Sequence, residues 1–540
     1  MMLPVQGTSC RSYEYIKIRI FTWALCILQY GQTRPWDVSD CSQFAGSVKS
    51  ALDDGSRILN ETYYPVGGLN ITNVSNSKPL CRIFGETDYA NNNTILFQLW
   101  LPAPADYSSR FLVTCHIHAY STRLLTVSRT GNGGMAGTID EAALMKNTNE
   151  GYAVAGGDGG HRASENNGGS GNPGVYLPYM HDQAQVQAWI HNSIAQFTPV
   201  ARFLTEQFYR EPARHSYYVG CSTGGAQGFA LAQYHPGLFD GIIAGCPGNW
   251  YSHLALSFLW NSQKTQGSSY LPQSALDLIT KLALAQCDAI DGVEDGVIEN
   301  PLLCDFDINS LACDASATDP MRCLTETQLA AAKDIYAGPV DSRTNASLYP
   351  GFSLGSETQW AMQEGELANA FTIPILQNMV FGNLAYDAGN FNWGSDVDLL
   401  NERVGTYVDE INPDLSAFQK AGGKMIVMQS WADPYNAALW PIQHLKQLEE
   451  ASGGNVGDWF RLFMVPGGGH CGSASNYPQV PAEWHSLEAM TEWIESKALP
   501  EEMTSSNPAD KSSKTRKLCP WPKTAKYTGG NTDEWTSYKC

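Results

Sequence analysis

Residues 217–225 read Tyr-Tyr-Val-Gly-Cys-Ser-Thr-Gly-Gly, a short apolar run that leads into a serine flanked by glycines. The run predicts a β-strand, and the alanine-rich residues 226–234 predict a helix directly after it. Glycines fit a turn from strand to helix that is too tight for side chains, which leaves the hydroxyl of Ser222 exposed. Ser222 is therefore a candidate nucleophile, although glycine-rich turns with serine are also common in other loops.

Apolar runs followed by turns and helical patterns recur along the chain, for example at residues 424–429. Such units predict an α/β protein with a mostly parallel sheet covered by helices. Residues 246–409 break the pattern, with four cysteines between residues 287 and 323 and several Asp-Gly turns, and we interpret them as an inserted lid domain. The catalytic domain is then expected to comprise residues 36–245 and 410–540.

Two later residues are candidate partners of the serine. In hydrolases with a G-x-S-x-G turn, an acid and then a histidine follow the serine, each after a later strand. Asp433 follows the strand-like residues 425–429, and His470 follows residues 462–465 and a glycine-rich turn. Asp433 could instead cap a helix that begins near Pro434, and His470 could be a structural loop histidine.

Cysteines lie directly beside two of these candidates, because Cys221 precedes Ser222 and Cys471 follows His470. A disulfide holds its two Cα atoms about 5.5 Å apart. A bond between these cysteines would therefore bring the histidine and the serine into the same small volume.

Three motifs together resemble the tannase and feruloyl esterase family: Gly-Cys-Ser-Thr-Gly-Gly at 220–225, Trp-Ala-Asp-Pro at 431–434 and Gly-His-Cys at 469–471. The similarity covers roughly residues 41–540. It implies an α/β-hydrolase fold with a lid, which hydrolyses feruloyl, other hydroxycinnamoyl or galloyl esters. It also implies a catalytic triad of Ser222, Asp433 and His470, and a disulfide that joins the cysteines beside the serine and the histidine.

The oxyanion hole is expected to use the backbone amide of Thr223 and that of Gly133 or Gly134. In the family a strand like Arg110-Phe111-Leu112 runs almost directly into the glycine loop, whereas here Val113–Thr130 intervenes. Residues 113–129 are interpreted as a translated intron, and a genuine surface loop at residues 113–130 is the alternative.

The resemblance also implies a structural calcium site in the lid. One glycine-punctuated loop supplies the hard oxygen ligands that Ca²⁺ prefers. The expected ligands are the side chains of Asp288, Asp291 and Asp295 and the carbonyls of Val293 and Val297. An acidic turn without metal is the alternative.

Disulfide pairing is expected to be mostly local. Beyond Cys221 with Cys471, the expected pairs are Cys287 with Cys304, Cys313 with Cys323, Cys519 with Cys540, and Cys41 with Cys81. Cys246 is left over from these disulfide pairs, together with Cys10, Cys26 and Cys115.

Composition indicates a secreted protein. Fourteen cysteines without a C-x-x-C pair favour disulfides over zinc, and disulfides persist in oxidising compartments. The net charge of −20 disfavours nucleic acid and anionic membranes as partners.

Residues 1–35 are interpreted as a degraded leader or a wrongly translated N-terminus. Five sequons are candidate glycosylation sites: Asn60, Asn70, Asn73, Asn92 and Asn345.

Three alternatives stay open on sequence alone. A peptidase on the same fold would share the triad. A calcium-stabilised binding protein would keep the lid without turnover. An inactive product would result if residues 113–129 were a translated intron. The expected substrate is a small phenolic ester or a feruloylated polysaccharide.

Overall fold

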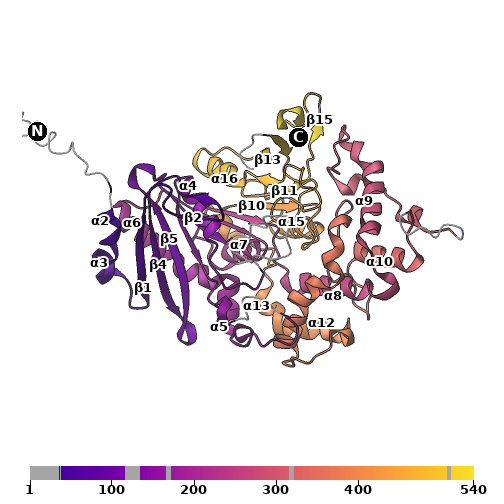
Figure 1. Cartoon of the computed structure of the whole chain (residues 1–540), viewed down its shortest axis with the longest axis horizontal. Coiled ribbons are helices and arrows are strands. Elements are labelled where there is room, and N and C mark those ends of the chain that lie inside the picture. Colours follow the sequence, from indigo (N-terminus) through magenta and orange to yellow (C-terminus); the bar gives the residue numbers. More distant parts are fainter. Residues whose placement is uncertain (1–35, 37, 116–133, 166–171, 315–321, 508–512) are drawn as a thin grey trace, which may run out of the picture.

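A computed structural model describes residues 36, 38–115, 134–165, 172–314, 322–507 and 513–540. Its main sheet has nine strands in the order β1-β4-β5-β7-β6-β8-β9-β10-β11 (Figure 1). The bounds are β1 Ser56–Tyr64, β4 Leu80–Tyr89, β5 Asn93–Pro102, β6 Arg110–Cys115, β7 Ala153–Gly157, β8 His215–Cys221, β9 Gly241–Gly245, β10 Lys424–Ser430 and β11 Phe460–Val465. The six strands from β7 to β11 in this order are parallel, whereas β1, β4 and β5 pair antiparallel.

Helices cover both faces of this sheet. Side chains of β6 show the two faces, because Phe111 and Val113 belong to one core and Leu112 to the other. The first core includes residues of α6 (Ser193–Tyr209), α7 (Thr223–Tyr234) and α15 (Leu439–Ala451). The second includes residues of α4 (Glu141–Asn149) and α16 (Ser486–Glu495). Burial on both faces explains why the central strands are almost wholly apolar.

Strand β6 corrects one expectation from the sequence. The intervening segment was expected to begin at Val113, but β6 continues to Cys115. Val113 pairs with Ala155 on one side and Tyr218 on the other, and it is fully buried. Residues 113–115 are therefore part of the sheet and not of a surface loop. Residues 116–133 lie outside the described part of the chain.

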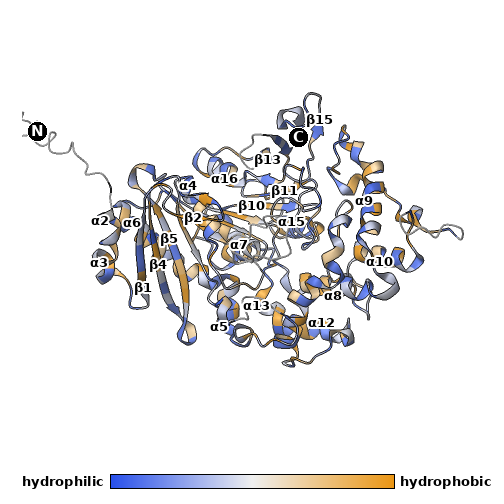
Figure 2. Cartoon of the chain, viewed as in Figure 1, coloured by the Kyte–Doolittle hydropathy of each residue, from blue (hydrophilic) through white to orange (hydrophobic). Residues whose placement is uncertain are grey.

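The described residues of the inserted segment, 246–314 and 322–409, contribute no strand to the nine-stranded sheet. Its longer helices are α8 (Tyr251–Lys264), α9 (Gln273–Cys287) and α10 (Glu326–Ala337), with the shorter α12 (Ser395–Leu400) and α13 (Thr406–Val408). Figure 1 shows α8, α9, α10 and α12 gathered at the end of the molecule opposite β1. Figure 2 shows orange and blue residues alternating along α9 and α10, as expected for helices with one apolar side.

The two ends of the inserted segment are held together. The Glu410 amide donates to the Asn249 carbonyl at 2.7 Å, and the Asn249 side chain donates back to the Glu410 carbonyl at 2.9 Å. The segment therefore leaves and rejoins the sheet domain at one place.

The C-terminal region adds a second, three-stranded sheet of β12 (Glu483–Trp484), β13 (Met503–Asn507) and β14 (Lys514–Leu518). A final two-stranded hairpin pairs β15 (Lys526–Tyr527) with β16 (Tyr538–Lys539). Within the described ranges, no helix has the length and apolar character needed to span a bilayer.

Candidate active site

Ser222 lies in a sharp turn between β8 and α7, with φ 62° and ψ −120°. The two flanking glycines make this turn sterically feasible. A Cβ on Gly220 would lie 2.4 Å from the Gly224 carbonyl oxygen, and one on Gly224 would lie 2.3 Å from the Cys115 carbonyl oxygen. Non-glycine residues with such backbone angles are strained, and strain of this kind gathers at functional sites. The turn thus has the geometry that exposes a nucleophile.

Asp433 follows β10 and is almost fully buried. Its Oδ1 accepts the backbone amides of Tyr435 at 2.8 Å and Asn436 at 3.0 Å. The alternative that Asp433 caps a helix beginning near Pro434 is wrong, because the next helix, α15, begins at Leu439. The amide bonds close a tight turn instead, which fixes the direction of the carboxylate.

His470 lies beside that carboxylate. Its Nδ1 is 3.0 Å from Asp433 Oδ1 and 2.9 Å from Oδ2. The ring of Tyr435 packs on the imidazole with centroids 4.4 Å apart. Nε2 of His470 is buried and has no hydrogen-bond partner among the described atoms. An imidazole held at Nδ1 by a carboxylate, with Nε2 open, has the orientation of a general base.

A disulfide joins Cys221 and Cys471, with their Cα atoms 6.0 Å apart. It connects the residue before Ser222 to the residue after His470, so the two turns are covalently coupled. Cys471 and Cys246 have φ angles of 63° and 37°, which adds two strained residues to Ser222. Ser222, Cys246 and Cys471 therefore all have strained backbone angles, and their proximity supports a functional role for these turns.

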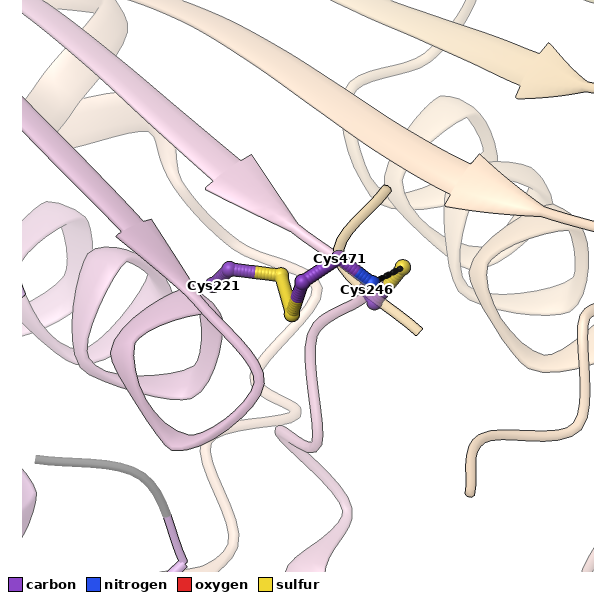
Figure 3. A group of neighbouring side chains, drawn as sticks. All are labelled: Cys221, Cys246 and Cys471. Carbon is purple, nitrogen blue, oxygen red and sulfur yellow. Dashed lines mark hydrogen bonds between the residues drawn. A yellow bond between two sulfur atoms is a disulfide. The ribbon is translucent and has the colours of Figure 1, made fainter. Parts of the chain in front are cut away.

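Cys246, left without a partner by the sequence, directly follows β9 and is fully buried. Its Sγ accepts the backbone amide of Cys471 at 3.4 Å (Figure 3). Burial raises the pKa of this thiol well above its usual value, and the charge of Asp433 raises it further. The thiol therefore stays protonated beside the histidine and the aspartate.

The predicted oxyanion residues are only partly within the described chain, since Gly133 lies outside it. Gly134 and Thr223 line one cavity together with Ser222. The Thr223 hydroxyl donates to the Gly134 carbonyl at 3.2 Å, and the Trp189 indole donates to the same carbonyl at 3.0 Å. These bonds fix the peptide of Gly134 against the start of α7, beside the serine.

Aromatic side chains form the wall of the cavity at Ser222, and the sequence did not identify them. Tyr251, Leu254, Ala255 and Phe258 come from one side of α8, Phe371 and Tyr435 add two further rings, and Gly248 and Asn436 also line the cavity. We call the first six of these residues the aromatic wall. The cavity has a volume of about 20 Å³, room for roughly one water molecule. Residues 251, 254, 255 and 258 follow the spacing i, i+3, i+4 and i+7, which places their side chains on one side of a helix. The side of α8 that lines the cavity could have been predicted from this spacing.

A larger cavity of about 520 Å³ lies elsewhere, between α4, α16 and the ends of β8 and β9. It reaches Cys471, but Ser222, Asp433 and His470 are not among its lining residues. The cavity bordered by the aromatic wall, by contrast, is lined by the candidate nucleophile Ser222.

Comparisons with known proteins identify the family of this chain. Residues 81–540 match the family model described as tannase and feruloyl esterase. The chain belongs to that family. It is therefore a carboxylic ester hydrolase of the feruloyl esterase and tannase type, with the α/β-hydrolase fold.

Individual relatives cover nearly the whole chain. An uncharacterised esterase of Xanthomonas campestris is 29% identical over 85% of this chain and 84% of its own. A probable feruloyl esterase B-1 of Aspergillus flavus is 28% identical over 93% of this chain and 95% of its own. The crystal structure of feruloyl esterase B from Aspergillus oryzae superposes with a TM-score of 0.79 at 23% identity, covering 92% of this chain and 99% of that one.

The predicted calcium loop of this esterase follows α9 and contacts the C-terminal strand β14. Asp288 accepts the backbone amides of Asp295 at 3.1 Å and Gly296 at 2.8 Å, which closes the loop. Arg516 of β14 is paired with Asp291 at 2.8 Å, with Glu299 at 2.9 Å and with Asp295. Three carboxylates thus share one guanidinium, and the carboxylate of Asp288 in the same loop brings the number of acidic groups to four.

This charge imbalance bears on the calcium prediction. Oδ1 of Asp295 is buried without a hydrogen-bond partner among the described atoms. The residues therefore fit a cation in charge and in this open oxygen. Among the described residues, however, these aspartates form no group whose ligand atoms all lie within 4.8 Å of one another. The carbonyl donors, Val293 and Val297, lie in the same loop.

The structure contains all five disulfides expected from the sequence: Cys41–Cys81, Cys221–Cys471, Cys287–Cys304, Cys313–Cys323 and Cys519–Cys540. All five sequon asparagines are exposed. Exposure makes them accessible to glycosylation, which stays a prediction.

Proposed function

We propose that this chain is a secreted serine esterase that cleaves esters of phenolic acids through an acyl-enzyme. One observation carries the proposal. His470 is held at Nδ1 by Asp433, its Nε2 is open, and a disulfide couples its turn to that of Ser222. This arrangement has the three roles that nucleophilic catalysis by serine requires.

In the proposed reaction, Ser222 attacks the ester carbonyl while His470 takes its proton at Nε2. Asp433 stabilises the imidazolium and keeps the proton on Nδ1. The amides of Thr223 and of the Gly133–Gly134 turn stabilise the negative oxygen of the tetrahedral intermediate. His470 then returns the proton to the leaving alcohol, and water releases the acid by the same steps in reverse.

The substrate class follows from the aromatic wall. The cavity at Ser222 has room for about one water molecule, so a phenolic acyl group enters only when the side chains of the wall move apart. The rings of Tyr251, Phe258, Phe371 and Tyr435 can then stack on the acyl ring or meet it edge to face, which is favourable for aromatic groups. The relatives named feruloyl esterase support the same class. Feruloyl and galloyl esters require identical chemistry at the carbonyl, so the choice between them depends on ring contacts.

Secretion is supported by the five disulfides and the five exposed sequons. A secreted enzyme of this class would meet its phenolic esters either as small molecules or attached to polysaccharide.

A structural calcium ion in the inserted segment is part of the proposal. Asp288, Asp291 and Asp295 would hold it with the carbonyls of Val293 and Val297. The ion would supply positive charge that Arg516 alone does not provide to the four carboxylates.

A direct assay tests the catalytic proposal. Hydrolysis of methyl ferulate, methyl gallate, chlorogenate and a peptide is measured with the wild type, Ser222→Ala and the control Ser452→Ala. Ser452 is an exposed residue just after α15. We expect Ser222→Ala to lower kcat by roughly 10⁴-fold or more on the phenolic esters, because removal of a triad serine removes the acyl-enzyme route.

Each outcome is informative. Equal rates for the wild type and Ser222→Ala would refute the serine mechanism. Faster cleavage of the peptide than of any ester would favour a peptidase. No turnover of any substrate by the wild type would favour a binding protein or an inactive product.

A further inference from the structure

Cys246 occupies a position between the catalytic turns that the proposed reaction does not use. Its amide donates to the Met428 carbonyl of β10 at 2.7 Å, and its carbonyl accepts the side-chain amide of Asn436. The backbone is therefore fixed on both sides. Figure 3 shows the Cys246 sulfur on one side of the Cys471 backbone nitrogen and the Cys221–Cys471 disulfide on the other.

Ligand atoms of three different kinds meet at this position. The sulfur of Cys246, a carboxylate oxygen of Asp433 and a ring nitrogen of His470 all lie within 4.8 Å of one another. Thiolate, imidazole and carboxylate are the three ligand types that zinc takes from proteins, and three protein ligands with one open position are typical of exchangeable zinc sites.

The distances require only a small rearrangement. Ligand atoms of a tetrahedral zinc ion lie about 3.5 Å apart, given bonds of roughly 2.0 to 2.3 Å. His470 Nδ1 and Asp433 Oδ2 are already 2.9 Å apart, so they need to separate slightly, and the sulfur needs to approach by about 1 Å or somewhat more.

We propose that Cys246, Asp433 and His470 form an inhibitory binding site for a thiophilic divalent cation such as Zn²⁺. The inference rests on the proposed function, because inhibition presupposes that Asp433 and His470 act in catalysis. The bound ion takes Nδ1 of His470, an oxygen of Asp433 and the thiolate of Cys246, whose proton is released to solvent, while the imidazole proton moves from Nδ1 to Nε2. His470 then lacks its orienting hydrogen bond and already carries a proton on Nε2, so it can no longer accept the proton of Ser222.

The thiol selects the kind of ion. Zn²⁺ and Co²⁺ accept sulfur ligands, whereas Ca²⁺ and Mg²⁺ prefer oxygen. Calcium held by the inserted segment is therefore not expected to compete for this site. The two metals can be studied in one sample.

Metal binding and inhibition are measured separately. Calcium-saturated, chelator-free wild type and the variants Cys246→Ala, Cys246→Ser and Cys115→Ala are titrated with ZnCl₂ in an ester assay. Each variant is compared with its own metal-free rate. Cys115 is the matched control, a second buried cysteine, at the end of β6. The same proteins are titrated with CoCl₂, and the near-ultraviolet charge-transfer band of a cobalt–thiolate bond is recorded.

We expect the zinc concentration for half-inhibition to rise at least about 10-fold in Cys246→Ala, and the cobalt–thiolate band to vanish in both Cys246 variants. Cys115→Ala should behave like the wild type.

Equal zinc sensitivity of the wild type and Cys246→Ala, or no thiolate band in the wild type, overturns the proposal. A thiolate band that depends on Cys246, without any loss of ester hydrolysis on metal binding, refutes inhibition through His470. Because the band is independent of turnover, it also reports binding if the proposed function itself fails.

Discussion

Asp433 performs two tasks with one carboxylate. Its Oδ1 closes the turn after β10 by accepting two backbone amides, and both of its oxygens approach Nδ1 of His470. The turn fixes the carboxylate, and the carboxylate in turn fixes the imidazole. The structural and the catalytic interpretations of this residue are therefore compatible.

Substituting Asp433 by asparagine separates these tasks. An asparagine still accepts the two amides, but it cannot stabilise a charged imidazole and favours the wrong tautomer of His470. We expect kcat on methyl ferulate to fall by about 10³- to 10⁴-fold, with little change in Tm. Asp414→Asn, at an exposed position, is the control. A loss confined to KM would contradict the assigned role.

The strands that precede the candidate catalytic residues were predictable from sequence, because each is an apolar run that ends in a turn. Residues 217–221 and 425–429 are strands as expected, within β8 and β10. The position of Cys246 was not predictable. Its approach to His470 depends on two loops, more than 200 residues apart in sequence, that meet only when β9 and β10 pair.

At the scale of elements, α8 and the short helix at Ala368–Thr372 determine the shape of the cavity at Ser222. The Phe371 ring lies so close to Gly134 that a Cβ there would be 2.6 Å from it. Phe258 and Tyr435 flank the same ring at centroid distances of 5.8 and 6.4 Å. Phe371 therefore limits how large an acyl group can bind.

Shortening this side chain should broaden substrate choice. In Phe371→Leu, we expect kcat/KM for methyl sinapate, relative to that for p-nitrophenyl acetate, to rise about 10-fold, since differences of one or two carbon atoms have this size of effect. Phe381→Leu is the matched control, because Phe381 stacks on Tyr386 and is not among the cavity residues. An unchanged ratio in Phe371→Leu would show that another group limits the cavity.

Sequence reasoning located the inserted segment but not its contribution to the active site. The segment was recognised by its lack of strand patterns and by its several cysteines. Its contribution to the aromatic wall depends on which side of α8 packs toward Ser222, and this is a property of the folded chain.

The end of β6 was misplaced for a related reason. Thr114 and Cys115 look polar or ambiguous in sequence, yet both pair in the sheet beside β8.

At the scale of the whole molecule, Glu410 joins the inserted segment to α7. Its carboxylate accepts the side-chain amide of Gln233 at 2.9 Å and is almost fully buried. Burial raises the pKa of Glu410 to about 8, and the nearby Asp409 contributes to the rise. Folding therefore favours the protonated acid.

The sign of the pH dependence follows from this shift. Because the folded-state pKa exceeds the usual value, this contribution is fully present below about pH 4.5 and is lost as pH rises toward 8. We expect the wild-type Tm to fall over this range and Glu410→Gln to fall less, measured by differential scanning fluorimetry. Glu402→Gln, at an exposed position, should follow the wild type. Parallel curves for the wild type and Glu410→Gln would exclude Glu410 as the cause.

Calcium is expected to stabilise the contact between the inserted segment and the C-terminal strands. Asp291, Asp295 and Glu299 share the guanidinium of Arg516 in β14, and Asp288 lies in the same loop, so repulsion among the four carboxylates grows when no further cation is present. Removing the ion should therefore loosen both the loop and its attachment to β14.

Chelation provides the measurement. An ion present at 100 times its Kd stabilises a fold by about 2.7 kcal/mol, so EGTA should lower the Tm by several degrees and added Ca²⁺, but not Mg²⁺, should restore it. Asp288→Asn should lower the Tm without chelator and respond less to calcium. Asp305→Asn, an exposed control near the loop, should respond like the wild type. If EGTA leaves the wild-type Tm unchanged, Arg516 alone is sufficient to hold the four carboxylates together, and the loop is an acidic turn without metal.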